Sequence, residues 1–246
     1  MHLPRFFLNE KIQTNTHILL PKAISHHAKQ VLRLRNYSNI ILFNGESGEF
    51  KATIEFQKDK TFALISSFDP REAELDGDIT LIQSMTTNNK MDFIIEKASE
   101  LGVKTIIPLY TKRSIIHIAN EKLEKRMSHW SKIAESASEQ CGRNRITKIA
   151  KPIEFNSYMA SPLNNIHLFC NTKSNIKIEK LLLSRNNINS LSIMIGPEGG
   201  WSQEECLIAE STINIYPVNS GSRILRTETA GIVITSIASS TLLWNN

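Results

Sequence analysis

The sequence has few cysteines and no long apolar run. Cys141, Cys170 and Cys206 are widely spaced, odd in number and not arranged as a CxxC pair. We therefore expect neither a disulfide framework nor a structural zinc site, and a reducing cytoplasm is the expected compartment. The roughly 18 consecutive apolar residues of a membrane-spanning helix occur nowhere. The first residues, MHLPRFFLNEK, also lack the apolar core of a secretory signal, so we predict neither a signal peptide nor a membrane span.

The two common phosphate-binding patterns, G-x-x-x-x-G-K-[ST] and G-x-G-x-x-G, are also missing. The stretch IGPEGGWS, residues 195–202, nevertheless places glycines between an apolar strand and a helix that Ser202 and Glu205 would cap. Open α/β sheets bind ligands at such strand ends. Glu198 would repel a pyrophosphate, which favours a ligand without phosphates, such as one with a positive centre. A purely structural turn is the alternative.

The overall composition is that of an ordinary globular protein with a positive excess. Hydrophobic residues make up 41% of the 246 residues, enough to build a core in one large domain or two smaller ones. The formal net charge of +5 favours anionic partners. It attracts phosphates such as those of RNA without specifying a sequence.

The pattern of apolar residues changes near residue 72 and indicates two domains. Residues 1–68 contain short runs rich in β-branched and aromatic residues, with one helical pattern at SHHAKQVLRLR, and predict a small β-barrel or sandwich. The charged stretch DPREAELDGD is the candidate linker. From residue 79 onward, apolar strands alternate with helical patterns, which predicts an α/β fold with a parallel sheet covered by helices on both faces. We therefore expect domains at residues 1–72 and 73–246.

Three arginine-containing stretches could carry function. SGSRILRTETAG places Arg223 and Arg226 at the start of an apolar helix, where Arg226 could instead form a surface ion pair with Glu228. SEQCGRNR carries Arg143 and Arg145 at a helix end. Such arginines could bind phosphates, or they could simply complement the helix dipole. TKRS, which contains Arg113, leaves the same two alternatives open.

Taken in order, these stretches resemble a known family. KASELGVKTIIPLYTKRS, WSKIAESASEQCGRNR, IGPEGGWSQEE and SRILRTETA are similar to the signature segments of RsmE-type 16S ribosomal RNA methyltransferases of the SPOUT superfamily. LPRFFL and HHAKQVLRLR resemble the opening domain of that family, so the resemblance covers essentially the whole chain. Two departures are Ser220, where members often have leucine, and RLRNYSNI, which lacks the glycine usual after that helix.

The resemblance implies a fold, a reaction and partners. It implies a PUA-like β-barrel followed by a SPOUT domain whose C-terminal segment forms a trefoil knot. It also implies a homodimer, no metal, and methylation of N3 of a uridine in 16S rRNA of the small ribosomal subunit. The methyl donor would be S-adenosyl-L-methionine, which carries a sulfonium cation and no phosphate, as the glycine stretch favours.

The resemblance also implies site residues. The residues expected to hold S-adenosylmethionine are Phe169, Gly196, Pro197, Glu198, Gly199, Gly200, Val218, Gly221, Ile224 and Leu225. Arg226 is the predicted catalytic residue, because a guanidinium could stabilise the developing uridine anion, and Glu228 is a weaker candidate for a base. The residues expected to contact RNA are Arg5, Arg33, Arg113, Arg143, Arg145 and Arg223.

Two other functions stay open at this stage. The chain could be a non-catalytic RNA-binding assembly protein, which predicts no binding of S-adenosylmethionine. It could also methylate another RNA position or a tRNA, because the glycine stretch does not identify the acceptor.

Overall fold

The computed structural model describes residues 3–244 and divides them into two compact units. The first unit comprises Met1–Glu74 and Ser138–Ile146, and the second comprises Leu75–Ala137 and Thr147–Asn246. The segment Ser138–Ile146 therefore belongs to the first unit, whereas the sequence pattern placed it in the second domain.

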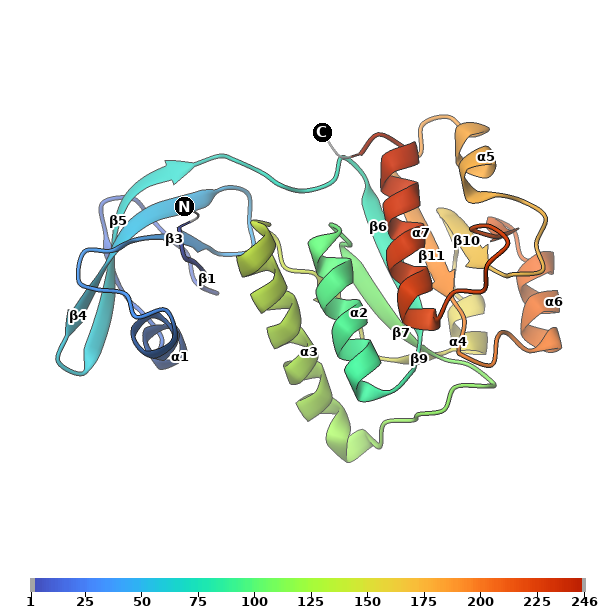
Figure 1. The fold of residues 1–246 in the computed structure, drawn as a ribbon, viewed down its shortest axis with the longest axis horizontal. Coiled ribbons are helices and arrows are strands. Elements are labelled where there is room, and N and C mark those ends of the chain that lie inside the picture. The colour runs from blue at the N-terminus through green and yellow to red at the C-terminus, as the bar shows by residue number, and fades with distance from the viewer. Residues whose placement is uncertain (1–2, 245–246) are drawn as a thin grey trace. The chain divides into compact units, whose positions relative to one another are not determined.

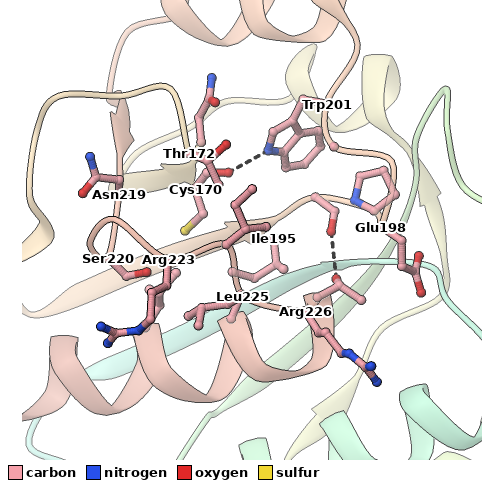
Figure 2. A pocket seen from close by; sticks show the side chains of 18 of the residues that line it. Cys170, Thr172, Ile195, Glu198, Trp201, Asn219, Ser220, Arg223, Leu225 and Arg226 are labelled. Carbon is pink, nitrogen blue, oxygen red and sulfur yellow. Dashed lines mark hydrogen bonds between the residues drawn. The ribbon is translucent and has the colours of Figure 1, made fainter.

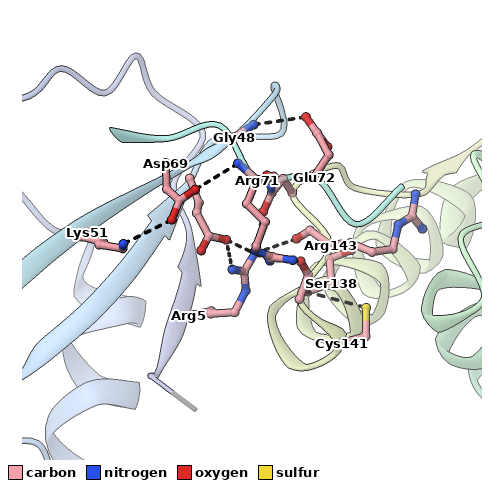
Figure 3. Close-up of polar contacts among 12 residues, drawn as sticks. Arg5, Gly48, Lys51, Asp69, Arg71, Glu72, Ser138, Cys141 and Arg143 are labelled. Atoms are coloured by element: carbon pink, nitrogen blue, oxygen red, sulfur yellow. Dashed lines mark hydrogen bonds and ion pairs between the residues drawn. The ribbon is translucent and has the colours of Figure 1, made fainter. Parts of the chain in front are cut away.

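Hydrogen bonds from two arginines explain this difference. Arg5 Nη2 donates to the carbonyl of Arg143 at 2.9 Å and to Oδ1 of Asn144 at 2.8 Å. Arg71 Nη2 donates to the carbonyl of Gly142 at 2.6 Å (Figure 3). The segment is thus joined by its backbone to residues that lie far from it in the sequence.

A five-stranded sheet, ordered β1-β3-β4-β5-β2, forms most of the first unit (Figure 1). Its strands are β1 (Arg5–Phe7), β2 (His17–Leu19), β3 (Asn39–Phe43), β4 (Glu49–Gln57) and β5 (Lys60–Asp69). Helix α1 (Lys22–His26) continues into a π-helical turn, His27–Val31. Apolar residues alternate along these strands and bury one face in a core that includes Phe6, Ile40 and Ile54. The predicted small β-rich domain is confirmed.

The second unit is built on a seven-stranded sheet in which every pairing is parallel. The strand order is β12-β10-β11-β6-β7-β8, and β9 also pairs with β7. The strands are β6 (Asp78–Ser84), β7 (Thr105–Tyr110), β8 (Lys148–Ile149), β9 (Ile153–Glu154), β10 (Ile166–Cys170), β11 (Ser190–Ile195) and β12 (Ile215–Val218). The predicted parallel α/β sheet is therefore confirmed.

Helices cover this sheet, as the nearly continuous apolar strands predict. The helices that follow β6 in the chain are α2 (Asn88–Glu100), α3 (Asn120–Cys141), α4 (Phe155–Met159), α5 (Ile178–Leu183), α6 (Gln203–Ser211) and α7 (Thr227–Thr241). Helix α7 lies beside α2 and packs on β6 and β11 (Figure 1). Helices α4 and α6 contact each other and cover a separate apolar cluster that includes Phe169 and Met194. Within residues 3–244, no helix combines the length and the apolar character that crossing a bilayer requires.

Candidate functional site

A cavity of about 430 Å³ lies at the carboxyl edge of the sheet in the second unit (Figure 2). It is formed by the loop after β10 (residues 171–177, the first loop), the loop after β11 (residues 196–202, the glycine loop), the loop after β12 (residues 219–226, the arginine loop) and the start of α7. Its polar lining residues are Lys90, Asn171, Thr172, Glu198, Asn219, Ser220, Arg223, Arg226 and Thr227. Its apolar lining residues include Ile195, Val218, Leu225 and Ile234.

Trp201 fixes the shape of the glycine loop. Its indole stacks on the ring of Phe169 with centroids 4.5 Å apart, and its Nε1 donates to the carbonyl of Cys170 at 2.9 Å (Figure 2). A Cβ on Gly196 would lie 3.0 Å from this indole, and Gly200 has a φ of +69°. Both positions therefore favour glycine, one for space and the other for backbone conformation.

A buried hydrogen-bond chain joins the glycine loop to the sheet and to α7. Thr227 Oγ1 donates to the carbonyl of Gly196 at 2.8 Å, and Gln83 Nε2 donates to Thr227 Oγ1 at 2.9 Å. At the other end of the loop, Ser202 and Glu205 form the predicted capping box of α6. The loop is thus held at both ends, which is how a preformed binding site is built.

Glu198 faces a charged cluster at the side of the cavity. Its Oε1 accepts a hydrogen bond from the Thr86 hydroxyl and lies 3.1 Å from Lys90 Nζ, and Lys90 Nζ lies 3.3 Å from Glu228 Oε2. Burial of Glu198 opposes ionisation, but the hydrogen bonds from Thr86 and Lys90 outweigh it and lower the pKa of Glu198. The hydrogen bond to Glu198 likewise raises the pKa of Lys90 against a smaller desolvation effect. Lys90 is therefore a permanent cation that joins α2, the glycine loop and α7.

Most residues predicted to hold the cofactor line this cavity. They are Gly196, Pro197, Glu198, Gly200, Val218, Gly221, Ile224 and Leu225. Phe169 and Gly199 do not line it. Phe169 is fully buried beneath Trp201, and the Gly199 carbonyl accepts a hydrogen bond from Arg113 Nη1 at 2.7 Å.

The structure also adds lining residues that the sequence pattern did not identify. Asn171 and Thr172 follow β10, and Ser220, which departs from the usual family residue, lines the cavity as well. The signal for the first two was the end of the β10 strand pattern, since side chains that follow a parallel strand lie at the binding edge.

Both arginines of the arginine loop line the cavity, and both are exposed. Arg226 precedes α7 as its N-cap residue, and Figure 2 shows its side chain extending away from Trp201. Between the two arginines, Ile224 is 86% exposed. The arrangement therefore presents cations beside a largely apolar cavity.

Two arginines predicted to bind RNA instead form buried ion pairs within the first unit. Arg5 pairs with Glu49, and their side chains are 9% and 5% exposed (Figure 3). Arg143, 4% exposed, donates from Nη2 to Glu74 Oε2 at 2.6 Å and from Nε to both carboxylate oxygens. Because these guanidinium groups are buried in ion pairs, the RNA-binding prediction is not kept for Arg5 or Arg143.

The other predicted RNA contacts are exposed. They are Arg33, Arg113, Arg145 and Arg223. Arg145 lies 3.8 Å from Glu72, and its side chain keeps 54% exposure. In residues 3–244, no three His, Cys, Asp or Glu side chains lie close enough together to share a metal ion.

Comparison with family models assigns this chain, with its parallel sheet and edge cavity, to a known class of proteins, the RNA methyltransferases. A family model described as "RNA methyltransferase domain" matches residues 73–239. A second model, "RNA methyltransferase PUA domain", matches residues 20–65. The chain belongs to this RNA methyltransferase family, and its N-terminal domain is PUA-like.

Relatives and solved structures narrow the family to one type of protein. The ribosomal RNA small subunit methyltransferase E of Buchnera aphidicola is 32% identical, over 94% of this chain and 93% of that protein. The structure of the same type of enzyme from Neisseria gonorrhoeae, bound to S-adenosyl methionine, is 33% identical with a TM-score of 0.88, over 99% and 98% of the two chains. A Legionella pneumophila methyltransferase with bound SAM has a TM-score of 0.91 at 30% identity, over 98% of each chain. The family resemblance seen in the sequence is confirmed.

Proposed function

We propose that this chain transfers a methyl group from S-adenosylmethionine to N3 of a uridine in 16S ribosomal RNA. The observation that carries the proposal is the cavity at the carboxyl edge of the sheet. It occurs in a chain that is 33% identical, over 99% of its length, to a ribosomal RNA small subunit methyltransferase E bound to S-adenosyl methionine. The uridine and the N3 position come from the family resemblance.

The lining fits S-adenosylmethionine in size and chemistry. A volume of about 430 Å³ lies within the range of small-molecule sites, roughly 300–1,000 Å³. Gly200 and Gly221 have positive φ angles, and a Cβ on either would meet nothing within 4 Å, so the backbone there is open to a ligand. When bound, S-adenosylmethionine supplies a methyl group on a sulfonium sulfur. The backbone of the glycine and arginine loops would hold its adenosine, and Leu225 and Ile195 contribute apolar lining.

Arg226 is the proposed catalytic residue. Uridine N3 is a neutral imide: its proton passes to water, and the N3–CH3 bond forms as the bond between methyl and sulfur breaks. Loss of the proton places negative charge on the flanking carbonyl oxygens. A guanidinium presents N–H donors in a planar fork that suits such acceptors and stabilises the developing charge. Arg226 is exposed and lines the cavity, so its guanidinium is available for this role.

Glu228 is assigned a positioning role. Its carboxylate is engaged by Lys90, whose ammonium also pairs with Glu198 on the glycine loop. Through Lys90, Glu228 therefore helps to set the distance between the glycine loop and the start of α7. This use of Glu228 replaces the weaker suggestion that it acts as a general base.

The acceptor would be a splayed nucleotide in structured RNA. N3 lies on the pairing edge of uracil and is blocked in a duplex, so the base must leave its pair before reaction. The exposed arginines would contact phosphates and fix the register without reading sequence; they are Arg33 and Arg145 in the first unit and Arg113 and Arg223 in the second.

Further parts of the proposal rest on the family resemblance. They are a homodimer, a trefoil knot in the C-terminal segment of a SPOUT domain, a cytoplasmic location, and a reaction without metal. The small ribosomal subunit, assembled or assembling, is the proposed partner.

Methyl transfer by the purified chain tests this function. The chain would be incubated with S-adenosylmethionine carrying an isotope-labelled methyl group and with 16S rRNA or small subunits from cells that lack the modification. Mass spectrometry of the nucleosides is expected to find the label in 3-methyluridine. Label in another nucleoside would overturn the assigned position, and the absence of label would overturn the reaction.

A further inference from the structure

A second pocket adjoins the proposed methyl-transfer cavity. It has a volume of about 830 Å³ and lies between the first loop and the arginine loop. Its lining residues include Thr172, Lys173, Ser174, Lys177, Ser222 and Arg223. Thr172, Asn219, Ser220, Gly221, Arg223, Ile224 and Leu225 also line the first cavity. A ligand in this pocket would therefore lie next to the ligand of the first cavity.

The charge of this pocket has one sign. Lys173, Lys177 and Arg223 line it and all three are exposed, and none of the described residues that line it carries a carboxylate. Among residues 3–244, no Asp or Glu oxygen lies within 4.0 Å of these three cationic groups. Hydroxyls of Thr172 and Ser222 add hydrogen-bond donors. The pocket therefore offers charge and donors to an anion.

The backbone that carries these cations is held in place. Asn219 N donates to the carbonyl of Ile176 at 2.8 Å, and Asn219 Nδ2 donates to the carbonyl of Ser174. Ser174 Oγ donates to the carbonyl of Pro217 at 2.7 Å, and Lys177 forms a parallel bridge with Asn219. These bonds join the first loop to the end of β12, so the positions of Lys173 and Lys177 are set by the fold.

We propose that this pocket binds a backbone phosphate of the RNA substrate, next to the nucleotide that enters the methyl-transfer cavity. The inference rests on the proposed function and adds Lys173 and Lys177 to its RNA-binding surface. Ammonium and guanidinium groups that contact phosphate oxygens fix the position of an RNA strand without reading its bases. Arg223, which lines both cavities, connects the phosphate to the reacting nucleotide.

The test is a charge-removal variant, Lys173→Gln/Lys177→Gln. The bonds that join the first loop to β12 use backbone groups and the side chains of Ser174 and Asn219, so the substitutions leave that frame in place. A matched control is Lys125→Gln/Lys148→Gln, which removes the same charge from two exposed lysines of the second unit. Lys148 lies on β8, at the opposite edge of the sheet from β12.

The affinity of each variant for 16S rRNA would be measured over a series of salt concentrations. The log–log salt slope of binding is expected to become shallower by up to about 0.7, the value for one phosphate of single-stranded RNA, and only in the Lys173/Lys177 variant. Affinity at moderate salt is expected to fall about tenfold relative to the control, because the bound phosphate loses two of its three cations. A slope and an affinity equal to those of the control would overturn the proposal.

The carboxylate of the methyl donor is a second anion that this pocket could bind instead of the RNA phosphate. Calorimetry with S-adenosylmethionine alone distinguishes these two occupants. We expect the Lys173/Lys177 variant to bind the donor within twofold of wild type. A loss of donor affinity with unchanged RNA binding would assign the pocket to that carboxylate and overturn the inference.

Methyl transfer by the wild-type protein is measured in the same RNA preparations. This measurement shows whether a negative result contradicts the phosphate pocket or the proposed function. An active wild type whose Lys173/Lys177 variant binds RNA normally would contradict the phosphate pocket alone. A wild type that binds RNA but transfers no methyl group would contradict the proposed function, and with it the assignment of the pocket to a substrate.

Discussion

The hydroxyl of Thr227 donates to the carbonyl of Gly196 at 2.8 Å and so ties the first turn of α7 to the glycine loop. Gln83 of β6 donates to the same hydroxyl, so Thr227 links the sheet, the glycine loop and α7 through hydrogen bonds. The two sides of the cavity are therefore positioned by one buried side chain, 5% exposed.

Thr227→Val removes both hydrogen bonds and leaves the volume of the side chain almost unchanged. We expect the free energy of unfolding to fall by about 1–3 kcal/mol, because the Gly196 carbonyl and the Gln83 amide lose a buried partner. S-adenosylmethionine is expected to bind about tenfold more weakly, which corresponds to a loss of about 1.4 kcal/mol of binding free energy when the glycine loop is no longer held in position. Urea unfolding and calorimetry measure the two effects. Thr229→Val, on the exposed side of the same turn, is the control, and equal effects of both substitutions would contradict the role of Thr227.

Gly200→Ala tests the backbone of the glycine loop. A Cβ there would meet no atom within 4 Å, so any effect comes from the φ of +69° rather than from a clash. The left-handed conformation costs a non-glycine residue about 1–2 kcal/mol, and donor affinity is expected to fall by up to about tenfold. Gly199→Ala, at which a Cβ would lie 3.4 Å from Arg113 Cδ, should keep normal affinity by calorimetry. Equal donor affinities of Gly200→Ala and Gly199→Ala would contradict the role of the left-handed backbone at Gly200.

The contact between Lys90 and Glu198 predicts a pH dependence. The pKa of Glu198 is lowered from 4.5, so its contribution is present above that value and is lost as the pH falls through the lower folded pKa. The pKa of Lys90 is raised from 10.5, so its contribution is present below that value and is lost as the pH rises through the higher folded pKa.

The variant Lys90→Met removes this contribution together with the contact between Lys90 and Glu228. The difference in free energy of unfolding between wild type and Lys90→Met is expected to be constant from about pH 5 to pH 10 and to shrink outside this window. Urea unfolding at a series of pH values measures it, and Lys90→Met/Glu198→Gln serves as the reference without the pair. A difference that changes steadily through neutral pH would show that another group titrates.

Arg143→Ala tests the finding that this arginine is structural. Glu74 would lose its guanidinium partner, and removing one member of a buried ion pair costs about 3 kcal/mol. Arg145→Ala, whose side chain is 54% exposed, should change the free energy of unfolding by less than about 0.5 kcal/mol. Urea unfolding followed by circular dichroism compares the two variants. Stable folding of Arg143→Ala with weakened RNA binding would restore the original prediction for Arg143.

Much of the fold could be predicted from local patterns, because strand and helix periodicity follow directly from burial. The capping box at Ser202 and Glu205 was readable for the same reason: both residues lie within one turn. The roles of Arg5 and Arg143 were not readable. Their partners Glu49 and Glu74 lie 44 and 69 residues away in the sequence, and neither spacing has a periodic signal.

The candidate site shows the same limit. The three loops follow from strand ends, but the direction of each side chain within a loop does not. The glycine pattern predicted that Glu198 lies at the ligand cavity, which it lines, but it could not predict the ion pair of Glu198 with Lys90 of α2. Phe169 follows the strand pattern, but its ring is covered by Trp201.

Arg226→Ala tests the proposed catalytic residue. Removing one donor that stabilises developing charge lowers kcat about 100- to 1,000-fold. Arg226→Lys keeps the charge without the planar fork, and we expect intermediate activity. Calorimetry should find donor affinity within about threefold of wild type for both variants, since the interaction forms only during reaction. Near-normal turnover by Arg226→Ala, measured as methyl transfer to 16S rRNA, would remove the assignment.

The most direct test of the central claim is the 3-methyluridine content of small-subunit rRNA in a strain that lacks this gene. We predict that mass spectrometry of the nucleosides shows loss of 3-methyluridine, that the wild-type gene restores it, and that the Arg226→Ala gene does not. An unchanged level of 3-methyluridine in the deletion strain would contradict the claim, even if the purified chain binds S-adenosylmethionine.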